Sequence, residues 1–477
     1  MTCYRALKTH DPRFDGRFFV AVRSTRIYCR PVCRVKTPKQ ENCTFYSTAA
    51  AAEASGYRPC LRCRPELAPG NASVDAVERI ARSTAALIDE GLLGEVGLDG
   101  IAERLGITSR HMRRVFQAEF GVTPVAYAQT QRLLLAKQLI ADTSLSMTDI
   151  AFAAGFQSVR RFDALFQERY RLSPRMLRRA PINQRAPDSL CFELSYRPPY
   201  DWDGILSFLS ARAIAGVEEV SPSFYRRTVR IRSLGKSHLG WIEVTHRPAR
   251  QTMHVSVSAS LTKVIPAVLA RVKRLFDLSC HPADVNGLLG TLATARPGLR
   301  VPGAFDGFEV AVRAVLGQQI SVSAARTLAG RFAAAFGTAV QSPFAELCFA
   351  FPNAGEVARL SLSDIARLGI TSARAQTILE IAKTIAQGDL HLSPETEPIE
   401  TIQKLKAIAG IGEWTAQYIA MRALAWPDAF PHTDLGIKKA LNENNPKKLL
   451  ARAESWRPWR AYAAMHLWTN GNGSSRR

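Results

Sequence analysis

Long apolar runs are missing from this sequence of 477 residues. Its longest uncharged stretch, residues 332–345, spans 14 residues and contains Gly, Gln, Ser and Pro, so it is too short and too polar to cross a bilayer. The N-terminal residues include Arg5 and Lys8, and no apolar segment of a secretory signal follows them. We therefore expect a cytoplasmic protein with no membrane partner.

Acidic side chains are scarce relative to basic ones. The sequence has 41 Asp and Glu against 63 Lys and Arg, which gives a formal net charge of +22. The positive charge is spread along the chain and is densest in the first 70 residues, which hold 13 basic and 5 acidic side chains. A field of this size attracts polyanions. Nucleic acid is therefore the favoured partner, and a membrane surface or nonspecific basicity is the alternative.

Disulfides are not expected, because disulfide frameworks are rare in a reducing compartment. Six of the nine cysteines fall in the first 63 residues, and the other three are isolated residues that we expect to be buried. Cys29 and Cys33 form one close pair, and Cys60 and Cys63 form a second, with 26 residues between the pairs. Two such pairs brought together give a tetrahedral thiolate site that suits Zn²⁺.

The surroundings of these cysteines are strongly basic. Most four-cysteine zinc sites only stabilise a fold, and that structural role is the alternative here. Thiolates close to many cations stay deprotonated and nucleophilic, and the same cations would hold a nucleic-acid backbone near the sulfur. The basic residues concerned are Arg23, Arg26, Arg30, Arg34, Lys36, Arg58, Arg62 and Arg64.

The cysteine-rich segment resembles the N-terminal domain of the Ada methylation-response family. The resemblance is carried by residues 18–33, 45–46 and 56–63 and covers nearly all of residues 1–70. It implies a zinc-bound cysteine that takes a methyl group from a methylphosphotriester in DNA. By position the acceptor is Cys29, and the resemblance makes the other three cysteines, Cys33, Cys60 and Cys63, its co-ligands; the spacing alone does not choose among them.

The charge of such a site has a consequence of its own. A zinc ion with four thiolates carries a net charge of −2 and repels phosphates, whereas methylation of one sulfur leaves −1. DNA binding should therefore tighten when the site is methylated.

Two helix-turn-helix patterns follow. The first predicts a helix over residues 101–105, a turn over 106–108 and a second helix capped by Ser109; the second predicts a helix over 150–154, a turn over 155–157 and a helix capped by Ser158. Capped helices with leading arginines suit the major groove, although a single pattern is as often an ordinary helical hairpin. The exposed arginines expected at these helices are Arg110, Arg113, Arg114, Arg160 and Arg161. Two units in tandem resemble the AraC-type DNA-binding domain, over most of residues 90–179.

A glycine motif opens a helix near the C-terminal end. Gly410 and Gly412 would let a DNA phosphate approach the backbone N–H groups of that helix, although a plain helix–helix turn is the alternative. Asp434 follows 22 residues after the second glycine. A helix-hairpin-helix with an aspartate at this distance resembles the HhH-GPD glycosylases, and the wider chain resembles their AlkA-type 3-methyladenine branch over nearly all of residues 190–470.

The resemblance implies both the reaction and its residues. Alkylated purines are cationic leaving groups, and Asp434 would stabilise the developing sugar cation or orient a water. Relatives that also cleave the strand have a lysine where this chain has Trp414, so we expect a monofunctional enzyme that leaves an abasic site. The flipped base would lie among aromatic faces, although core packing is the alternative for each of them. By alignment these residues are Trp414, Tyr418, Trp468 and Phe208.

Two positions depart from the family pattern. The wedge that fills the space left by the flipped base would be Gln319, where leucine is expected, and Leu435 follows the aspartate where an aromatic is expected. Both departures concern the substrate range rather than the reaction class. A Pro-Cys-His-Arg run typical of the alkylguanine transferase of complete Ada proteins is absent from the sequence, so we do not expect O6-methylguanine repair.

Together the motifs predict a multidomain α+β protein that is mostly α. We expect a small zinc-binding α/β domain over residues 1–70, an all-α tandem helix-turn-helix domain over 71–180, a mixed α+β domain over 188–297 and an all-α helix-hairpin-helix glycosylase domain over 298–470.

The function expected is repair of DNA alkylation and its regulation, by a DNA-3-methyladenine glycosylase II that also transfers methyl groups from methylphosphotriesters to a cysteine. The alternative is a transcription regulator whose C-terminal half binds damaged DNA without catalysis. The expected cofactor is Zn²⁺, and the expected partners are double-stranded DNA, at alkylated sites and promoters, and RNA polymerase, in the nucleoid.

Overall fold

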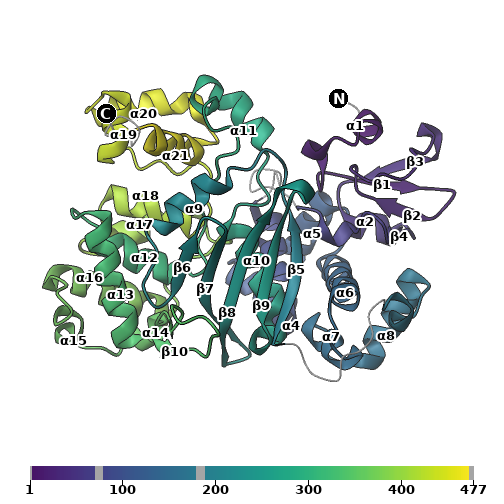
Figure 1. Cartoon of the computed structure of the whole chain (residues 1–477), viewed down its shortest axis with the longest axis horizontal. Helices are drawn as coiled ribbons and strands as arrows, with labels where there is room; N and C mark the ends of the chain where they lie inside the picture. The colour runs from purple at the N-terminus through teal and green to yellow at the C-terminus, as the bar shows by residue number, and fades with distance from the viewer. Residues whose placement is uncertain (1–2, 70–78, 179–187, 472–477) are drawn as a thin grey trace.

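The computed structural model describes residues 3–69, 79–178 and 188–471 (Figure 1). The expected domain boundaries near residues 70 and 180–188 fall largely outside these ranges. The fold is mostly helical with two main sheets, as predicted. Within the described ranges, every helix is either too short or too polar to span a membrane.

The cysteine-rich segment folds around a four-stranded sheet with the order β3-β1-β2-β4. Strand β1 lies between β3 and β2 and is antiparallel to both, whereas β2 and β4 pair in parallel. The elements are α1 (Cys3–Lys8), η1 (Pro12–Phe14), β1 (Phe19–Val22), β2 (Ile27–Cys29), η2 (Gln40–Asn42), β3 (Cys43–Tyr46), α2 (Ala49–Ala54), β4 (Arg58–Pro59) and η3 (Pro65–Leu67).

Six helices form the two helix-turn-helix units. Ser158 caps α8 as predicted, but the prediction of Ser109 as the first cap is wrong: Thr108 accepts the N–H of His111, because a hydroxyl one residue earlier lies at the extended position that a cap requires. The elements are α3 (Arg79–Asp89), α4 (Leu93–Arg104), α5 (Ser109–Phe120), α6 (Pro124–Asp142), α7 (Met147–Ala153), α8 (Val159–Tyr170) and η4 (Pro174–Leu177).

The next segment is an antiparallel sheet with the order β5-β9-β8-β7-β6, which faces the viewer in Figure 1. Its buried face packs with α9 and α10 and, in the same apolar cluster, with side chains of α6, α7 and α8. The elements are β5 (Ser189–Ser195), α9 (Trp202–Ser210), β6 (Glu218–Ser221), β7 (Phe224–Ser233), β8 (Lys236–Arg247), η5 (Pro248–Arg250), β9 (Thr252–Ser258), η6 (Ala259–Val264), α10 (Ile265–Leu275), α11 (Pro282–Leu289) and η7 (Gly290–Ala293).

The last segment is helical, as predicted, apart from one two-residue ladder between β10 and β11. Its large apolar core also takes in Ile214 and Val217, which precede β6. The elements are α12 (Gly307–Leu316), α13 (Val322–Phe336), β10 (Thr338–Ala339), β11 (Phe349–Ala350), α14 (Ala354–Val357), α15 (Leu362–Ala366), α16 (Ser372–Gln387), α17 (Pro398–Ala407), α18 (Glu413–Arg422), α19 (Leu435–Leu441), α20 (Pro446–Ala453), η8 (Glu454–Trp456) and α21 (Arg460–Gly471).

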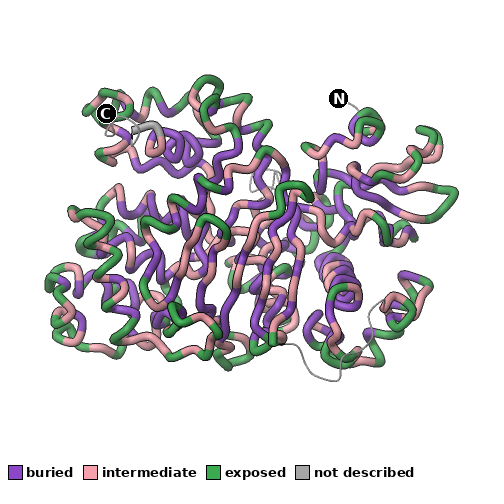
Figure 2. The backbone as a smooth tube through the Cα atoms, in the orientation of Figure 1, coloured by how far each residue is buried: buried purple, intermediate pink, exposed green. Residues whose placement is uncertain are grey.

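Helix α6 joins three of these segments and is buried along most of its length (Figure 2). Its Leu134 packs into the core of the cysteine-rich segment. Lys137 is buried and lies 2.6 Å from the buried carboxylate of Glu66 in η3. The side chain of Gln138 donates to the backbone carbonyl of Glu193 in β5 at 3.4 Å. One helix of the DNA-binding segment thus packs on both of its neighbours.

A single buried carboxylate, Glu53 of α2, connects the cysteine-rich segment to both helix-turn-helix units. It accepts hydrogen bonds from Tyr28 at 2.9 Å, from Thr130 of α6 at 3.0 Å and from Tyr170 of α8 at 3.3 Å. Burial raises the pKa of Glu53 to about 7, against the lowering effect of these three donors. The folded state therefore holds a proton on Glu53 that the unfolded chain, with a pKa near 4.5, has already released.

We expect Glu53→Gln to remove a pH dependence of stability. Since the folded pKa is raised, the wild-type contribution is greatest below the unfolded pKa and is lost as the pH rises through about 7. The wild-type urea midpoint should therefore fall between about pH 5 and about pH 7 by more than that of the variant. Glu168→Gln, at an exposed position of α8, serves as the control, and an equal fall in all three proteins would contradict the prediction.

Candidate functional site

The four paired cysteines lie together at one end of the small sheet. Their sulfurs are all within 4.8 Å of one another. The parallel pairing of β2 with β4 brings the second pair to the first, because the backbone N–H of Cys60 donates to the carbonyl of Tyr28, the residue before Cys29. Four thiol sulfurs in a largely buried cluster are the donor set that Zn²⁺ takes in tetrahedral sites. The residues present therefore fit the metal.

The sulfurs differ in their backbone partners. Cys63 Sγ accepts from the N–H of Arg30 at 3.4 Å, and Cys60 Sγ accepts from the N–H of Arg62 at 3.4 Å. Cys29 Sγ accepts neither of these two bonds, so less of its charge is dispersed than at Cys60 and Cys63.

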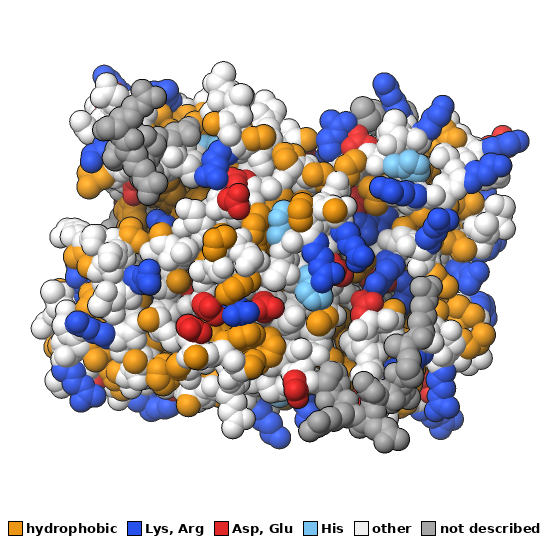
Figure 3. Space-filling view, viewed as in Figure 1, with side chains coloured by type: hydrophobic (Ala, Val, Ile, Leu, Met, Phe, Trp, Pro, Cys, Tyr) orange, Lys and Arg blue, Asp and Glu red, His pale blue; other side chains and the backbone are white. Residues whose placement is uncertain are grey.

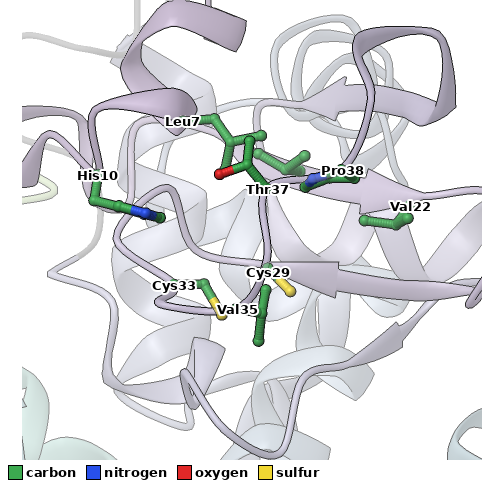
Figure 4. Close-up of a pocket in the computed structure, with 9 residues that line it drawn as sticks. Leu7, His10, Val22, Cys29, Cys33, Val35, Thr37 and Pro38 are labelled. Atoms are coloured by element: carbon green, nitrogen blue, oxygen red, sulfur yellow. The ribbon is translucent and has the colours of Figure 1, made fainter.

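A small, mostly apolar pocket opens beside two of the cysteines (Figure 4). Cys29 and Cys33 line it, whereas Cys60 and Cys63 are not among its lining residues. The other lining residues are Leu7, His10, Val20, Val22, Val35, Thr37 and Pro38. A molecule that enters this pocket would therefore reach Cys29 and Cys33 rather than Cys60 and Cys63.

The residue after Cys29 ties this cluster to the neighbouring sheet. The buried Arg30 forms an ion pair with Asp15 and donates to the carbonyl of Cys63 at 3.2 Å. Its guanidinium also lies 3.3 Å from the hydroxyl of Ser195, at the end of β5. The cysteine cluster and the five-stranded sheet are therefore in direct polar contact.

All five arginines predicted at the helix-turn-helix units are exposed: Arg110, Arg113 and Arg114 on α5, and Arg160 and Arg161 on α8. Figure 3 shows Lys and Arg side chains gathered on the right-hand part of this face, over the cysteine-rich and helix-turn-helix segments. On this face, the positive side chains therefore gather over the segments where polyanion contact was expected.

The glycines of the predicted hairpin have different roles. Gly410 has a φ of +89°, and a Cβ added there would lie 2.2 Å from the hydroxyl of Thr377, so no other residue fits. Gly412 is the N-cap of α18, and an added Cβ would meet nothing within 4 Å. Gln318 donates to the carbonyl of Gly410 at 2.8 Å and braces the hairpin against the end of α12. The open N-terminus of α18 is thus free to approach a phosphate.

Asp434 caps α19 and accepts hydrogen bonds from two indoles. Oδ1 accepts from the N–H of Ile437 at 3.1 Å and from Nε1 of Trp468 at 2.9 Å, while Oδ2 accepts from Nε1 of Trp414 at 2.8 Å. Helices α18, α19 and α21 therefore fix the orientation of one carboxylate. Sequence reasoning placed both tryptophans in the pocket but missed these hydrogen bonds, since nothing in a spacing of 20 or 34 residues indicates them.

The four predicted aromatic residues lie together beside Asp434. Trp414 and Tyr418 stack with ring centroids 5.2 Å apart and planes 12° apart. Trp468 lies 6.4 Å from Tyr418 and 6.5 Å from Phe208, which comes from α9 of the preceding segment. The site is therefore assembled from two segments of the chain.

Two arginines behind these rings were not predicted. Arg422 donates to the phenol oxygen of Tyr418 at 2.8 Å, and its guanidinium lies 4.8 Å from the centroid of Phe208. The guanidinium of Arg212 lies 3.9 Å from the same centroid. Burial acts to raise the pKa of Tyr418, but the charges of Arg422, Arg212 and Arg313 outweigh it, so that pKa is below 10. The guanidinium groups of Arg212 and Arg422 thus place positive charge against the aromatic cluster.

The two residues that depart from the family pattern are both exposed. Gln319, in the turn between α12 and α13, adopts a left-handed conformation with φ +55°. Leu435 has 72% of its surface exposed, directly after Asp434. Both are available to an incoming strand.

Family models match four consecutive stretches of the chain. The matches are the metal binding domain of Ada over residues 2–66, a helix-turn-helix domain over 101–180, the AlkA N-terminal domain over 191–306 and the HhH-GPD superfamily base excision DNA repair protein over 312–460. A relative from Mycobacterium tuberculosis, the "Probable bifunctional transcriptional activator/DNA repair enzyme AlkA", is 37% identical over 98% of this chain and 95% of its own length. The chain belongs to this AlkA family.

Two further comparisons concern the C-terminal half of this AlkA-family chain. The "DNA-3-methyladenine glycosylase 2" of Escherichia coli is 38% identical over 58% of this chain and 96% of its own length. The solved 3-methyladenine DNA-glycosylase of Archaeoglobus fulgidus is 20% identical, with a TM-score of 0.52 over 60% of this chain and 100% of its own, which shows the shared fold. The chain is a DNA-repair glycosylase joined to a helix-turn-helix domain and to an Ada-type domain whose cofactor is Zn²⁺, and DNA is its partner.

We expect zinc binding to require the four clustered cysteines. Cys33→Ser or Cys63→Ser should lose most of the bound metal, because one thiolate of the tetrahedral set is removed. Cys3→Ser and Cys43→Ser, outside the cluster, are the matched controls and should keep one zinc per chain. Metal analysis of protein folded under reducing conditions measures the zinc content of the variants and of the controls. Zinc loss in the controls alone would contradict the assignment.

Proposed function

We propose that this protein hydrolyses the N-glycosidic bond of alkylated purines, 3-methyladenine and 7-methylguanine, and leaves an abasic site. The observation that carries the proposal is the carboxylate of Asp434, held by two indole donors at the edge of an aromatic cluster. A carboxylate oriented in this way needs no reorganisation when positive charge develops beside it.

The chemistry follows from these residues. Alkylation makes the purine a cationic leaving group, and the flipped base would lie against Trp414, Tyr418, Trp468 and Phe208. As the glycosidic bond breaks, the electron pair leaves with the base and the sugar becomes a cation that Asp434 stabilises. A water then adds to the sugar carbon and releases its proton.

Several residues are proposed to hold the DNA. Gly410 and Gly412 present the N-terminus of α18 to a backbone phosphate. Gln319 is the proposed wedge, and its exposed position in the turn after α12 is compatible with insertion. Leu435 offers an aliphatic rather than an aromatic surface next to the base.

A lyase step is not part of the proposal. The position after the hairpin that would carry an amine nucleophile is Trp414, whose indole is bound to Asp434. Lys438 and Lys439, on the last turn of α19, are the nearest lysines along the chain and are proposed as phosphate contacts. A regulator that binds damaged DNA without catalysis would not require a carboxylate oriented by two indoles.

We expect Asp434→Asn to lower the rate of base release by about 100-fold or more, the loss of about 3 kcal/mol of electrostatic stabilisation. Asparagine can still cap α19, so fold and DNA affinity should be kept. Asp306→Asn is a matched control, because Asp306 caps α12 in the same way without indole partners. Release of 3-methyladenine from methylated duplex DNA is the measurement, and near-full activity of Asp434→Asn, or a covalent complex trapped by borohydride, would refute the mechanism.

The Trp468→Phe variant distinguishes the role of the indole N–H in orienting Asp434 from the role of the aromatic ring in stacking against the base. Phenylalanine keeps an aromatic face but donates no hydrogen bond to Oδ1 of Asp434. We expect the rate of base release to fall by about 10-fold, the cost of one hydrogen bond to a charged group, with little change in DNA binding. An unchanged rate would show that the indole N–H does not position the carboxylate.

For the Ada-type domain we propose stoichiometric transfer of a methyl group from a DNA methylphosphotriester to Cys29, with Cys33, Cys60 and Cys63 as the other zinc ligands. The bound zinc would keep the sulfurs as thiolates. The Cys29 sulfur attacks the methyl carbon, the carbon–oxygen bond breaks, and the phosphodiester leaves with the electron pair. The pocket beside Cys29, and the absence at Cys29 of the backbone bonds that Cys60 and Cys63 accept, support this choice.

The regulatory part of the proposal rests on charge. Methylation of Cys29 removes one negative charge from the site, and the arginines Arg110, Arg113, Arg114, Arg160 and Arg161 would contact promoter DNA. RNA polymerase is the proposed partner at the promoter, and the nucleoid is the proposed location.

We expect mass spectrometry to find the methyl group on Cys29 after incubation with methylphosphotriester DNA. Cys29→Ser should accept none, and Cys43→Ser, outside the cluster, should accept as much as wild type. The methylated protein should bind promoter DNA more tightly, because a negative charge near the phosphates has been lost. A methyl group on Cys33, Cys60 or Cys63 would refute the assignment.

A further inference from the structure

A histidine that follows helix α1, His10, extends into the pocket beside Cys29 (Figure 4). Its backbone N–H donates to the carbonyl of Leu7 at 3.1 Å. The next N–H, that of Asp11, donates to the carbonyl of Ala6 at 3.1 Å. These two bonds make the end of α1 a Schellman motif, in which the residue at the place of His10 adopts a left-handed conformation. The turn thus directs the imidazole from α1 toward the cysteine cluster.

A histidine at this place in the motif carries a conformational cost. The φ of His10 is +49°, in the left-handed region that glycine adopts freely and that residues with a side chain occupy less often. Glycine is also the usual residue at this place in a Schellman motif. Backbone strain of this kind clusters at functional sites, so the conformation of His10 agrees with a role for its imidazole.

The imidazole also has an unsatisfied nitrogen. Among residues 3–69, 79–178 and 188–471, Nδ1 of His10 is buried without a hydrogen-bond partner. A buried polar atom in this state costs free energy that a partner would restore. The pocket has a free volume of about 10 Å³, which is about the space that one water molecule or one methyl group needs. A ligand that brings an acceptor oxygen with its methyl group would therefore satisfy Nδ1.

The lining of the pocket indicates which ligand fits. Most of the lining is apolar and suits a methyl group. Its apolar residues are Leu7, Val20, Val22, Val35 and Pro38. Outside the cysteine cluster, His10 and Thr37 are the lining side chains that carry an N–H or an O–H donor. Of these two, His10 is the one with an atom that is buried and without a partner in the described part of the chain. A methyl group bonded to an oxygen therefore matches this lining.

We propose that His10 donates a hydrogen bond from Nδ1 to an oxygen of the methylphosphotriester and so makes this ester the preferred methyl donor for Cys29. The proposal rests on the methyl transfer proposed above for the Ada-type domain.

The role of His10 follows from where charge develops in this reaction. As the Cys29 sulfur bonds to the methyl carbon, the bond from that carbon to oxygen breaks, and the electron pair stays on the oxygen of the phosphodiester. The N–H of His10 then faces a growing negative charge, which a donor already held in place stabilises without reorganisation. The proton stays on His10 throughout, so the step needs no further reactant.

Two methyl donors test the proposal on the full-length, zinc-loaded protein. One is duplex DNA that carries a methylphosphotriester, and the other is methyl iodide, which brings a methyl group without a phosphate. Peptide mass spectrometry gives the rate of methylation at Cys29 with each donor. Of the three isolated cysteines, Cys280 is buried as expected, whereas Cys191 is half-buried and Cys348 is exposed. The exposed thiol of Cys348 is therefore the internal reference for the dose of methyl iodide.

We expect His10→Gly to lower the rate of methyl transfer from the triester by about 10-fold or more, the loss of one hydrogen bond to a developing charge. The rate from methyl iodide should be unchanged, because that donor has no oxygen for Nδ1 to contact. The zinc content should also be unchanged, since His10 is outside the cysteine cluster. The ratio of the two rates therefore reports the contact between His10 and the phosphate.

The same variant distinguishes a role in the reaction from a role in folding. Glycine adopts the left-handed conformation of residue 10 without strain, so the urea midpoint of His10→Gly should not fall below that of wild type. Leu234→Gly is the matched control, because Leu234 has a φ of +48° in the turn between β7 and β8, far along the chain from the pocket. This control should leave both methylation rates unchanged.

The outcomes separate this proposal from the one on which it rests. An unchanged rate from the triester in His10→Gly, or an equal fall with both donors, would overturn the role of His10 while wild-type transfer to Cys29 still stands. A wild-type protein that takes no methyl group from the triester at Cys29 would refute the methyl transfer itself, and the role of His10 with it.

Discussion

The arrangement of this protein depends on buried polar contacts that hold the Ada-type domain against helix α6. Glu53 accepts hydrogen bonds from its own domain and from both helix-turn-helix units, and Lys137 is paired with Glu66 where almost no solvent reaches. Removing one partner from such contacts leaves an uncompensated buried group, so the contacts fix one geometry even where they add little net stability. The DNA-binding helices are therefore oriented by the zinc-binding domain.

The same contacts place the cysteine cluster one residue from a domain interface. Tyr28, which precedes Cys29, donates to Glu53, and Arg30, which follows it, reaches Ser195 of the five-stranded sheet. The residues on either side of Cys29 therefore take part in the contacts that join the cysteine cluster to the rest of the protein.

Local patterns in the sequence predicted much of this structure. The cluster of four cysteines was predicted from the spacing of its two pairs, whereas Asp434 and the aromatic residues beside it, Phe208 among them, were predicted from family resemblance. Glu53 lies in an alanine-rich helix that sequence alone would place at the surface, and its burial depends on partners up to 117 residues away. The joint core of α6–α8 with the sheet also escaped prediction, because amphipathic patterns show which face is apolar but not what covers it.

The arginines behind the base pocket bear on how the proposed reaction selects its substrate. Arg422 draws electron density from Tyr418, and Arg212 lies against one face of Phe208, so both rings attract a cation less than free aromatic rings would. A cationic purine therefore gains less binding energy from these two rings than from Trp414 and Trp468, whose indole N–H groups donate to the carboxylate of Asp434. Its advantage is the weakened glycosidic bond, which breaks when Asp434 stabilises the sugar cation, whereas a normal purine keeps a poor leaving group in the same pocket. In the proposed reaction, selection therefore operates on the reactivity of the glycosidic bond as well as on affinity for the base.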